Sequence, residues 1–314
     1  MHRYGPDSYL RLARIPSMTS IHGLLETKPY LLMDGAWGTA LRERTKSPEA
    51  VPERYLWENP GVIADLAQEY AFSGAELITT NTFGVARFFL GAAEAPCSPW
   101  EMYARAVMLL HSVLGRRCYV LGSIGPLSSW ARSLGLPPAP PDVRERFYVG
   151  SAEAFAAAGA NAVLLETITD IDEACTAVRA IKRRLGGEVW ASVHPYRSGD
   201  SYVTADGSAL SDGFQKMADA GADVLGLNCG EGPEALVRAW ERIHGGLALP
   251  LFLRPSAGIP STDISGTLLY PVSAEDFATW GARVIRAGCR IFGGCCGTSP
   301  AYIRALRIRL NESA

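Results

Sequence analysis

Short apolar runs that alternate with helical segments are the feature that most constrains what this chain can fold into. Eight such runs recur along its 314 residues, each followed by a stretch with helical periodicity. They are YLLMDGAW (residues 30–37), ELITTNTF (76–83), YVLGSIGP (119–126), AVLLET (162–167), EVWASVHPY (188–196), VLGLNCG (224–230), PLFLRP (250–255) and RIFGGCCG (290–297). Near-continuous apolar strands are typical of parallel sheets covered by helices, and eight β–α units close a (β/α)8 TIM barrel. We therefore expect an α/β protein with this barrel fold.

Helical patterns and turn signals between the runs favour the barrel. Helices are predicted at residues 60–73, 100–114, 170–185 and 233–243 and from Pro300 onward, and several helices end in a small turn that contains glycine. The alternative is an open doubly wound sheet with a second domain, but MDGAWGT after the first run lacks the G-x-G-x-x-G dinucleotide fingerprint. We expect one barrel domain over residues 27–312, a short N-terminal extension over residues 1–26, and a long loop over the proline-rich residues 131–142.

Charge and composition exclude several classes of protein. The chain has 30 Lys and Arg against 32 Asp and Glu, so it lacks the basic excess expected of a protein that binds nucleic acid or an anionic membrane. No apolar run approaches the roughly 20 residues of a membrane helix, and the N-terminal segment lacks the apolar core of a secretory signal. Seven cysteines, an odd number without a small-scaffold spacing, disfavour a disulfide framework. These observations predict a cytoplasmic globular protein.

Three of the cysteines follow predicted strands. Cys229 is the last residue but one of the sixth run, and Cys295 and Cys296 are adjacent in GGCCG at the end of the eighth. Active sites of such barrels form at the carboxyl ends of the strands, and neighbouring cysteines, about 3.8 Å apart at Cα, do not readily form a disulfide. Side chains alternate along a regular strand, so both thiols reach one ion only if the flanking glycines allow a turn. Three thiolates suit Zn²⁺ and leave a fourth position for substrate, whereas the alternative is that they are small buried hydrophobes. That alternative is what we expect for the remaining cysteines, Cys97, Cys118, Cys175 and Cys289.

Seven strand-end motifs together carry a family resemblance. They are MDGAWGT, TTNTFG, GSIGP, LLET, GLNCGEGPE, RPSAGIP and GGCCGTSP, in this order, from about residue 30 to about residue 310. In these motifs the chain resembles the homocysteine S-methyltransferase family, which includes S-methylmethionine- and betaine-dependent enzymes and the homocysteine module of cobalamin-dependent methionine synthase. The resemblance implies a (β/α)8 barrel, zinc held by Cys229, Cys295 and Cys296, and methyl transfer to the thiol of homocysteine, which gives methionine. One departure is Ser256 in RPSAGIP, which stands where an asparagine is more usual.

The amino-acid end of such a substrate needs its own contacts. Asp34 and Glu166 can pair with an α-ammonium group, and the resemblance makes them the expected contacts, although Asp34 in Asp-Gly also suits an ordinary turn. The backbone N–H groups of Gly35 and Ala36 are candidates for the α-carboxylate, because glycine permits close approach. His194 in SVHPY is either a fourth zinc ligand in the resting enzyme or a core histidine. A free thiol has a pKa of roughly 8.5, and zinc binding favours the reactive thiolate, so we expect no catalytic side chain beyond the zinc ligands.

The methyl donor is open to two interpretations. The barrel takes up nearly the whole chain, so we expect a small onium donor, with S-methylmethionine first and S-adenosylmethionine or betaine behind it. Trp37 and Trp130 are candidates to face such a cation. The motif TTNTFG looks closest to the cobalamin-dependent module and favours a corrinoid protein as the donor instead. Two further hypotheses stay open: methyl transfer to another thiol or selenol, and a non-catalytic subunit of a corrinoid methyltransferase system that binds zinc or homocysteine.

Overall fold

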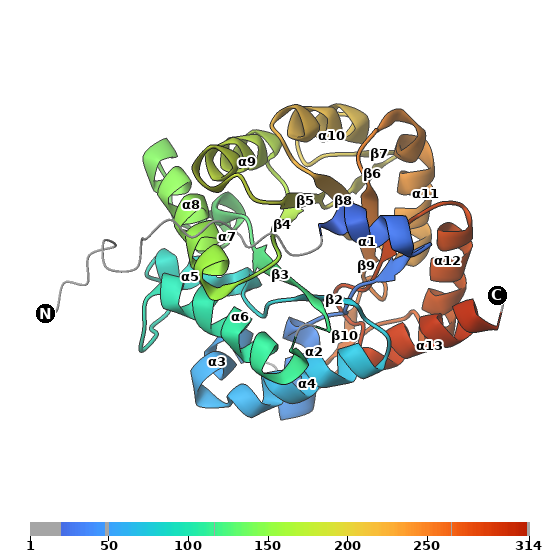
Figure 1. Ribbon diagram of the computed structural model, residues 1–314, viewed down its shortest axis with the longest axis horizontal. Coiled ribbons are helices and arrows are strands. Elements are labelled where there is room, and N and C mark those ends of the chain that lie inside the picture. The colour runs from blue at the N-terminus through green and yellow to red at the C-terminus, as the bar shows by residue number, and fades with distance from the viewer. Residues whose placement is uncertain (1–19, 48–49, 116, 265, 313–314) are drawn as a thin grey trace, which may run out of the picture.

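Eight parallel strands form the centre of the fold. The computed structural model describes residues 20–47, 50–115, 117–264 and 266–312. The strands lie side by side in the order β1-β12-β9-β8-β5-β4-β3-β2, and a parallel bridge between Met33 and Leu77 joins the two ends of this order. Their bounds are β1 (Leu31–Leu32), β2 (Leu77–Thr79), β3 (Tyr119–Ile124), β4 (Ala162–Ile168), β5 (Val189–Val193), β8 (Val224–Cys229), β9 (Leu251–Pro255) and β12 (Ile291–Phe292). The predicted (β/α)8 barrel is confirmed (Figure 1).

Helices surround these strands on the outside of the barrel (Figure 1). The longer helices are α2 (Gly38–Thr45), α4 (Pro60–Phe72), α6 (Pro99–Leu114), α8 (Pro141–Ala158), α9 (Ile171–Leu185), α10 (Leu210–Asp219), α11 (Pro233–Ile243), α12 (Ala274–Arg286) and α13 (Pro300–Asn311). The predicted helix positions are confirmed to within one residue at each of the bounds that the sequence specified. Gly159 ends α8 in the left-handed region, with φ of 90°, as expected of a glycine that follows a helix.

A short helix closes the amino-terminal end of the barrel. Helix α1 (Ile21–Thr27) begins after Ser20, whose hydroxyl accepts a hydrogen bond from the N–H of Gly23. Ile21 is fully buried among the side chains that fill the barrel, and its own N–H donates to Glu188 Oε2 at 3.2 Å. Residues 1–19 of the predicted extension lie outside the described residues, whereas residues 20–26 belong to this helix and its cap.

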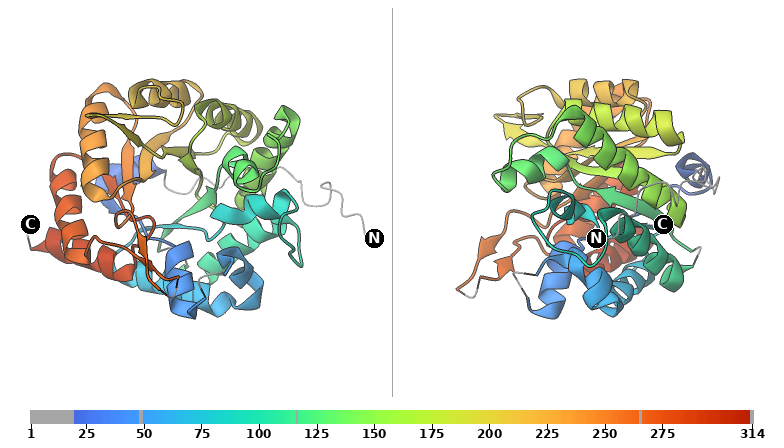
Figure 2. Two further views of the ribbon diagram at one scale, coloured as in Figure 1. Left: turned by 180° about the vertical axis from the view of Figure 1, so that it is seen from behind. Right: turned by 90° about the vertical axis from the view of Figure 1, so that its left-hand side faces the viewer.

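The opposite end of the barrel carries additional elements between the strands and the helices. Three short helices, α3 (Tyr55–Glu58), α5 (Ala86–Phe89) and α7 (Leu127–Ser133), follow β1, β2 and β3 respectively. Two antiparallel hairpins, which the sequence did not predict, pair β6 (Tyr196–Ser198) with β7 (Ser201–Val203) and β10 (Ser261–Thr262) with β11 (Leu268–Leu269). The right-hand view of Figure 2 shows the hairpin of β10 and β11, in orange, on the side opposite the dark-blue helix α1. Because α7 ends at Ser133 and α8 begins at Pro141, the expected long loop is shortened to residues 134–140.

None of the helices in the described ranges is long and apolar enough to span a membrane.

Two apolar layers hold the barrel together. Side chains inside the barrel form one cluster that includes Leu31, Met33, Trp190 and Phe252, and a larger cluster fills the space between the strands and the helices. Because the barrel interior is filled by apolar side chains near α1, the polar side chains gather at the carboxyl ends of the strands.

Candidate metal and substrate site

Three cysteine sulfurs meet at the carboxyl ends of β8 and β12. The Sγ atom of Cys229 lies 3.0 Å from that of Cys295 and 3.7 Å from that of Cys296, and all three lie within 4.8 Å of one another. Two sulfurs bound to one tetrahedral zinc at about 2.3 Å are roughly 3.8 Å apart. The distance of 3.7 Å between Cys229 and Cys296 matches this spacing, whereas the distance of 3.0 Å between Cys229 and Cys295 is shorter. Within the described residues, this is the one group of three or more His, Cys, Asp or Glu side chains placed to hold a metal ion.

The local backbone explains how sulfurs from consecutive residues reach one point. Cys229 has a φ of 63°, which few residues other than glycine adopt, so its side chain leaves the regular alternation of β8. In the loop after β12, Gly297 has a φ of 78°, and a Cβ on Gly294 would lie 2.2 Å from Thr298 Oγ1. The expected glycine-dependent turn is therefore present, but Gly294 is required by close packing and only Gly297 by its dihedral angle.

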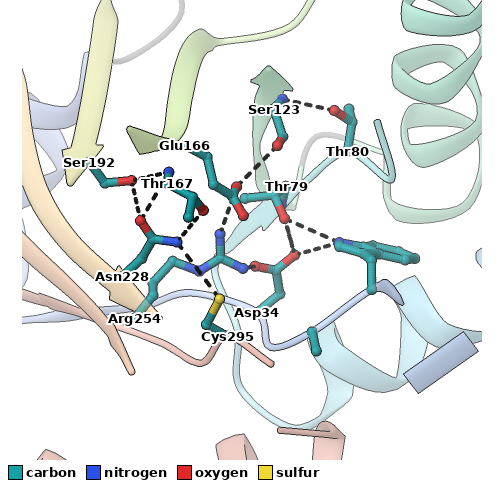
Figure 3. A network of polar contacts seen from close by, with 12 residues as sticks. Asp34, Thr79, Thr80, Ser123, Glu166, Thr167, Ser192, Asn228, Arg254 and Cys295 are labelled. Carbon is teal, nitrogen blue, oxygen red and sulfur yellow. Dashed lines mark hydrogen bonds and ion pairs between the residues drawn. The ribbon is translucent and has the colours of Figure 1, made fainter. Parts of the chain in front are cut away.

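Asn228 connects this sulfur cluster to two neighbouring strands, and its role was not predicted from the sequence. Its Oδ1 accepts hydrogen bonds from Ser192 Oγ at 2.8 Å and from the N–H of Thr167 at 3.1 Å. Its Nδ2 donates to Thr167 Oγ1 at 2.7 Å and to Cys295 Sγ at 3.7 Å (Figure 3). Thr167 has a φ of 61°, an uncommon conformation for a β-branched residue, and the two hydrogen bonds to Asn228 hold it there. The one signal in the sequence was an amide within an apolar strand.

Among the three cysteines, Cys295 is the one whose thiolate form the surroundings favour. Hydrogen bonds from Cys229 and Cys296 hold the pKa of Cys295 well below its ordinary value, and the nearby Arg254 guanidinium acts in the same direction. The hydrogen bond to Cys295 conversely raises the pKa of Cys229. A thiolate is the form that binds metal, so one ligand is already favoured in its binding form.

Arg254 of β9 lies between two carboxylates beside the sulfurs (Figure 3). Its side chain is almost completely buried. Its Nη2 contacts Asp34 Oδ1 at 3.0 Å and its Nη1 contacts Glu166 Oε2 at 3.2 Å. Its Nε donates to the carbonyl of Gly294 at 3.0 Å, and Nη2 also donates to the carbonyl of Gly35 at 3.2 Å. The sequence analysis gave Arg254 no role, and its partners come from distant parts of the chain.

The carboxylates of Asp34 and Glu166 differ in how many of their oxygens accept hydrogen bonds from the protein. Asp34 is fully buried, and its Oδ2 accepts three hydrogen bonds, from the N–H and Oγ1 of Thr79 at 2.8 Å each and from Trp37 Nε1 at 2.9 Å. Glu166 Oε2 also accepts from Ser123 Oγ at 3.0 Å, but Oε1 has no hydrogen-bond donor in the part of the chain that the structure describes. The Glu166 side chain is 12% exposed, compared with 0% for Asp34. Burial raises the pKa of both carboxyl groups, and the Arg254 charge opposes this effect.

The backbone groups predicted for the substrate carboxylate also differ. The N–H of Ala36 donates to Thr298 Oγ1 at 3.2 Å, whereas the N–H of Gly35 has no acceptor among the described residues. His194 follows β5, and its Nδ1 accepts a hydrogen bond from the N–H of Gly230 at 3.4 Å. Its ring nitrogens are not part of the three-sulfur group.

The two tryptophans considered for a cationic donor are both engaged by the protein. Trp37 is buried, and its ring nitrogen donates to Asp34 and to Thr79 Oγ1. The guanidinium carbon of Arg87 lies 4.3 Å from the centroid of the Trp130 ring, so a cation of the protein itself occupies one face of that ring. Neither tryptophan therefore supplies an argument for a cationic donor.

Fold and site together define a class, a (β/α)8 barrel in which three thiols placed to hold a metal ion lie beside buried charged side chains at the carboxyl ends of the strands. The sequence profile described as Homocysteine S-methyltransferase matches residues 31–310, nearly the whole barrel. The chain therefore belongs to the homocysteine S-methyltransferase family. This finding confirms the resemblance on which the sequence analysis relied.

Individual relatives agree with this family. The chain is 27% identical over 311 residues to the homocysteine S-methyltransferase of Escherichia coli, with 92% of this chain and 98% of that protein covered. The metallated crystal structure of the homocysteine methyltransferase MmuM from Escherichia coli superposes with a TM-score of 0.75 at 25% identity, over 92% of this chain and 99% of that chain. The methionine synthase of Mycobacterium leprae is 29% identical over 299 residues, and the chain spans 24% of its length.

Proposed function

We propose that this protein transfers a methyl group from a donor to the thiol of homocysteine and so forms methionine. The observation that carries the proposal is the convergence of Cys229, Cys295 and Cys296 beside the Arg254 carboxylate network. In the reaction, a bond forms between the homocysteine sulfur and the methyl carbon, the bond between this carbon and the donor breaks, and the thiol proton leaves to solvent. The family membership and the metallated form of the Escherichia coli structure support this assignment.

We further propose that the three thiols hold Zn²⁺. Three thiolates suit zinc, and three protein ligands leave one tetrahedral position for the substrate sulfur. Bound zinc favours the thiolate form of the substrate at neutral pH. Asn228 steadies this donor set through its hydrogen bond to Cys295 Sγ. Because free thiols of this kind persist in reducing compartments, a cytoplasmic location is part of the proposal.

The amino-acid end of homocysteine is assigned to the groups that the protein leaves unpaired. Glu166 Oε1 is the proposed acceptor for the α-ammonium group, and the N–H of Gly35 is the proposed donor to the α-carboxylate. Asp34 and Ala36, which the sequence analysis assigned to the same two groups, already have partners in Arg254 and Thr298. We therefore place Asp34 and Ala36 behind the contacting groups as positioning residues.

The donor is proposed to be a small onium compound, with S-methylmethionine preferred over S-adenosylmethionine and betaine. The match over 98% of the Escherichia coli homocysteine S-methyltransferase supports methyl transfer to homocysteine by a barrel of this size. The alternative is a methylated corrinoid protein, which the motif TTNTFG favours.

A donor panel tests the function. The purified zinc-loaded protein is incubated with homocysteine and with S-methylmethionine, S-adenosylmethionine, betaine or methylcobalamin separately, and methionine is measured. Methionine from a sulfonium or ammonium donor supports the proposal, and methionine from methylcobalamin alone replaces the donor class. Formation of no methionine from any donor, in a protein that binds zinc and homocysteine, favours a non-catalytic subunit. Methylation of another thiol or of a selenol in place of homocysteine corrects the acceptor.

A further inference from the structure

Arg254 is a buried charge that the proposed reaction does not use. Its guanidinium has two carboxylate partners, Asp34 and Glu166, so these three side chains together carry one negative charge when all are ionised. A buried charge is tolerated only when it is paired and hydrogen-bonded, and Arg254 has acceptors on Nε, Nη1 and Nη2. The remaining negative charge must therefore be balanced by something else.

The contacts show where this negative charge is available to a ligand. Both oxygens of Asp34 accept hydrogen bonds from the protein, and the side chain has no exposed surface. Glu166 shares only Oε2 with Arg254 and Ser123, and its side chain keeps some exposure. A ligand in the site meets one carboxylate oxygen, on Glu166, and it meets Asp34 only through Arg254.

We propose that Arg254 is a specificity-determining residue. Its ion pair with Asp34 keeps that carboxylate from contacting a ligand, so that Glu166 alone selects an acceptor thiol with a single ammonium group. This inference rests on the proposed function, because it names the acceptor class of the same site. Without Arg254 the two carboxylates carry two negative charges when ionised, and without Asp34 the remaining pair of Arg254 and Glu166 carries none. One net charge matches the one ammonium group of an α-amino acid.

The proposal makes an unusual prediction about paired substitutions. Asp34→Asn removes a carboxylate that the substrate does not touch, yet it should weaken selection for the ammonium group by cancelling the charge of the pocket. Adding Arg254→Gln restores one negative charge on Glu166, because the guanidinium that neutralised this carboxylate is gone. The double substitution should therefore recover the selectivity that the single substitution loses, whereas purely structural roles would make it worse.

The test compares homocysteine with 4-mercaptobutanoate, the same molecule without its amino group, by calorimetric binding to the zinc-loaded protein. A charge-assisted hydrogen bond predicts a preference for homocysteine of roughly ten- to a hundredfold in the unsubstituted protein. Glu166→Gln and Asp34→Asn should each reduce this preference to within about threefold, and Asp34→Asn with Arg254→Gln should return it. Zinc content and circular dichroism check that each variant is folded.

Each outcome decides between the possibilities. Equal binding of both thiols by the unsubstituted protein overturns the inference without any variant and leaves methyl transfer to homocysteine intact. A double variant that is folded but no more selective than Asp34→Asn also overturns it, because Asp34 then acts by direct contact or by structure alone. Binding of neither thiol refutes the proposed function, and the inference with it.

Discussion

The hydrogen bond from Asn228 to Cys295 makes a strong prediction about metal affinity. Asn228→Asp preserves the shape of the side chain but replaces Nδ2, the donor to Cys295 Sγ and to Thr167 Oγ1, with an oxygen. A hydrogen bond to a charged group contributes about 1.5–3 kcal/mol, and about 1.4 kcal/mol corresponds to tenfold in affinity. Loss of the thiolate contact alone should therefore weaken zinc binding by roughly 10- to 100-fold.

Competition for Zn²⁺ with a chromophoric chelator measures this change, with urea unfolding of the metal-free proteins run alongside. Ser192→Ala is the matched control, because it removes the hydroxyl that donates to Asn228 Oδ1 and leaves the contact with sulfur in place. The control should lose about 1 kcal/mol of unfolding free energy and keep its zinc affinity. The reasoning is refuted if Asn228→Asp binds zinc as tightly as the unsubstituted protein, or if Ser192→Ala weakens zinc binding equally.

Three further predictions concern the thiols and the closed end of the barrel. Cys295→Ser should abolish stoichiometric zinc binding and methyl transfer, whereas Cys175→Ser, at a buried position of α9, should keep both, as metal analysis and the donor assay will report. Ile21→Ala should lower the free energy of unfolding by about 2–5 kcal/mol without changing zinc affinity, because Ile21 is fully buried in the barrel interior. Burial raises the pKa of Cys118 to about 11, so only about one part in a thousand is thiolate at pH 8. Mass spectrometry should find Cys118 unmodified by iodoacetamide in the folded protein at pH 8 and modified in urea, and its modification in the folded state would contradict the assigned burial.

The barrel could be predicted from the sequence because its strands and helices are set by local apolar patterns. The runs that became β4 and β8 are buried on both faces and contain almost no polar residue before their last positions. The hairpin of β10 and β11 escaped prediction for the opposite reason. Its two strands are only two residues long, and Leu268 and Leu269 are exposed, so no period of buried residues marks them.

The candidate site could be predicted only in part. The thiols were found because cysteines at strand ends have few other uses, and Glu166 was found through the family resemblance. The functions of Arg254 and Asn228 depend on partners that sequence spacing does not identify. Arg254 and Asp34 are 220 positions apart, and only the closure of the barrel brings β1 and β9 to the same side. A polar residue in a buried strand indicates that a partner exists, but not which one.

The strand ladders of the barrel are shortest around β1 and β12. β12 pairs through two residues with β1 and through two with β9, and a single bridge joins Met33, after β1, to β2, whereas β8 and β9 share five paired positions. Segments with few ladder hydrogen bonds open locally at a lower free energy than the rest of a domain. Cys295 and Cys296 lie in the loop after β12, and Cys229 is the last residue of β8. An ion bound by all three cysteines would therefore connect β12, which has few paired positions, to the well-paired β8. The same ion would then serve the reaction and stabilise the pairing of these strands. Removal of the ion should first appear as faster amide hydrogen exchange in β12 and β1.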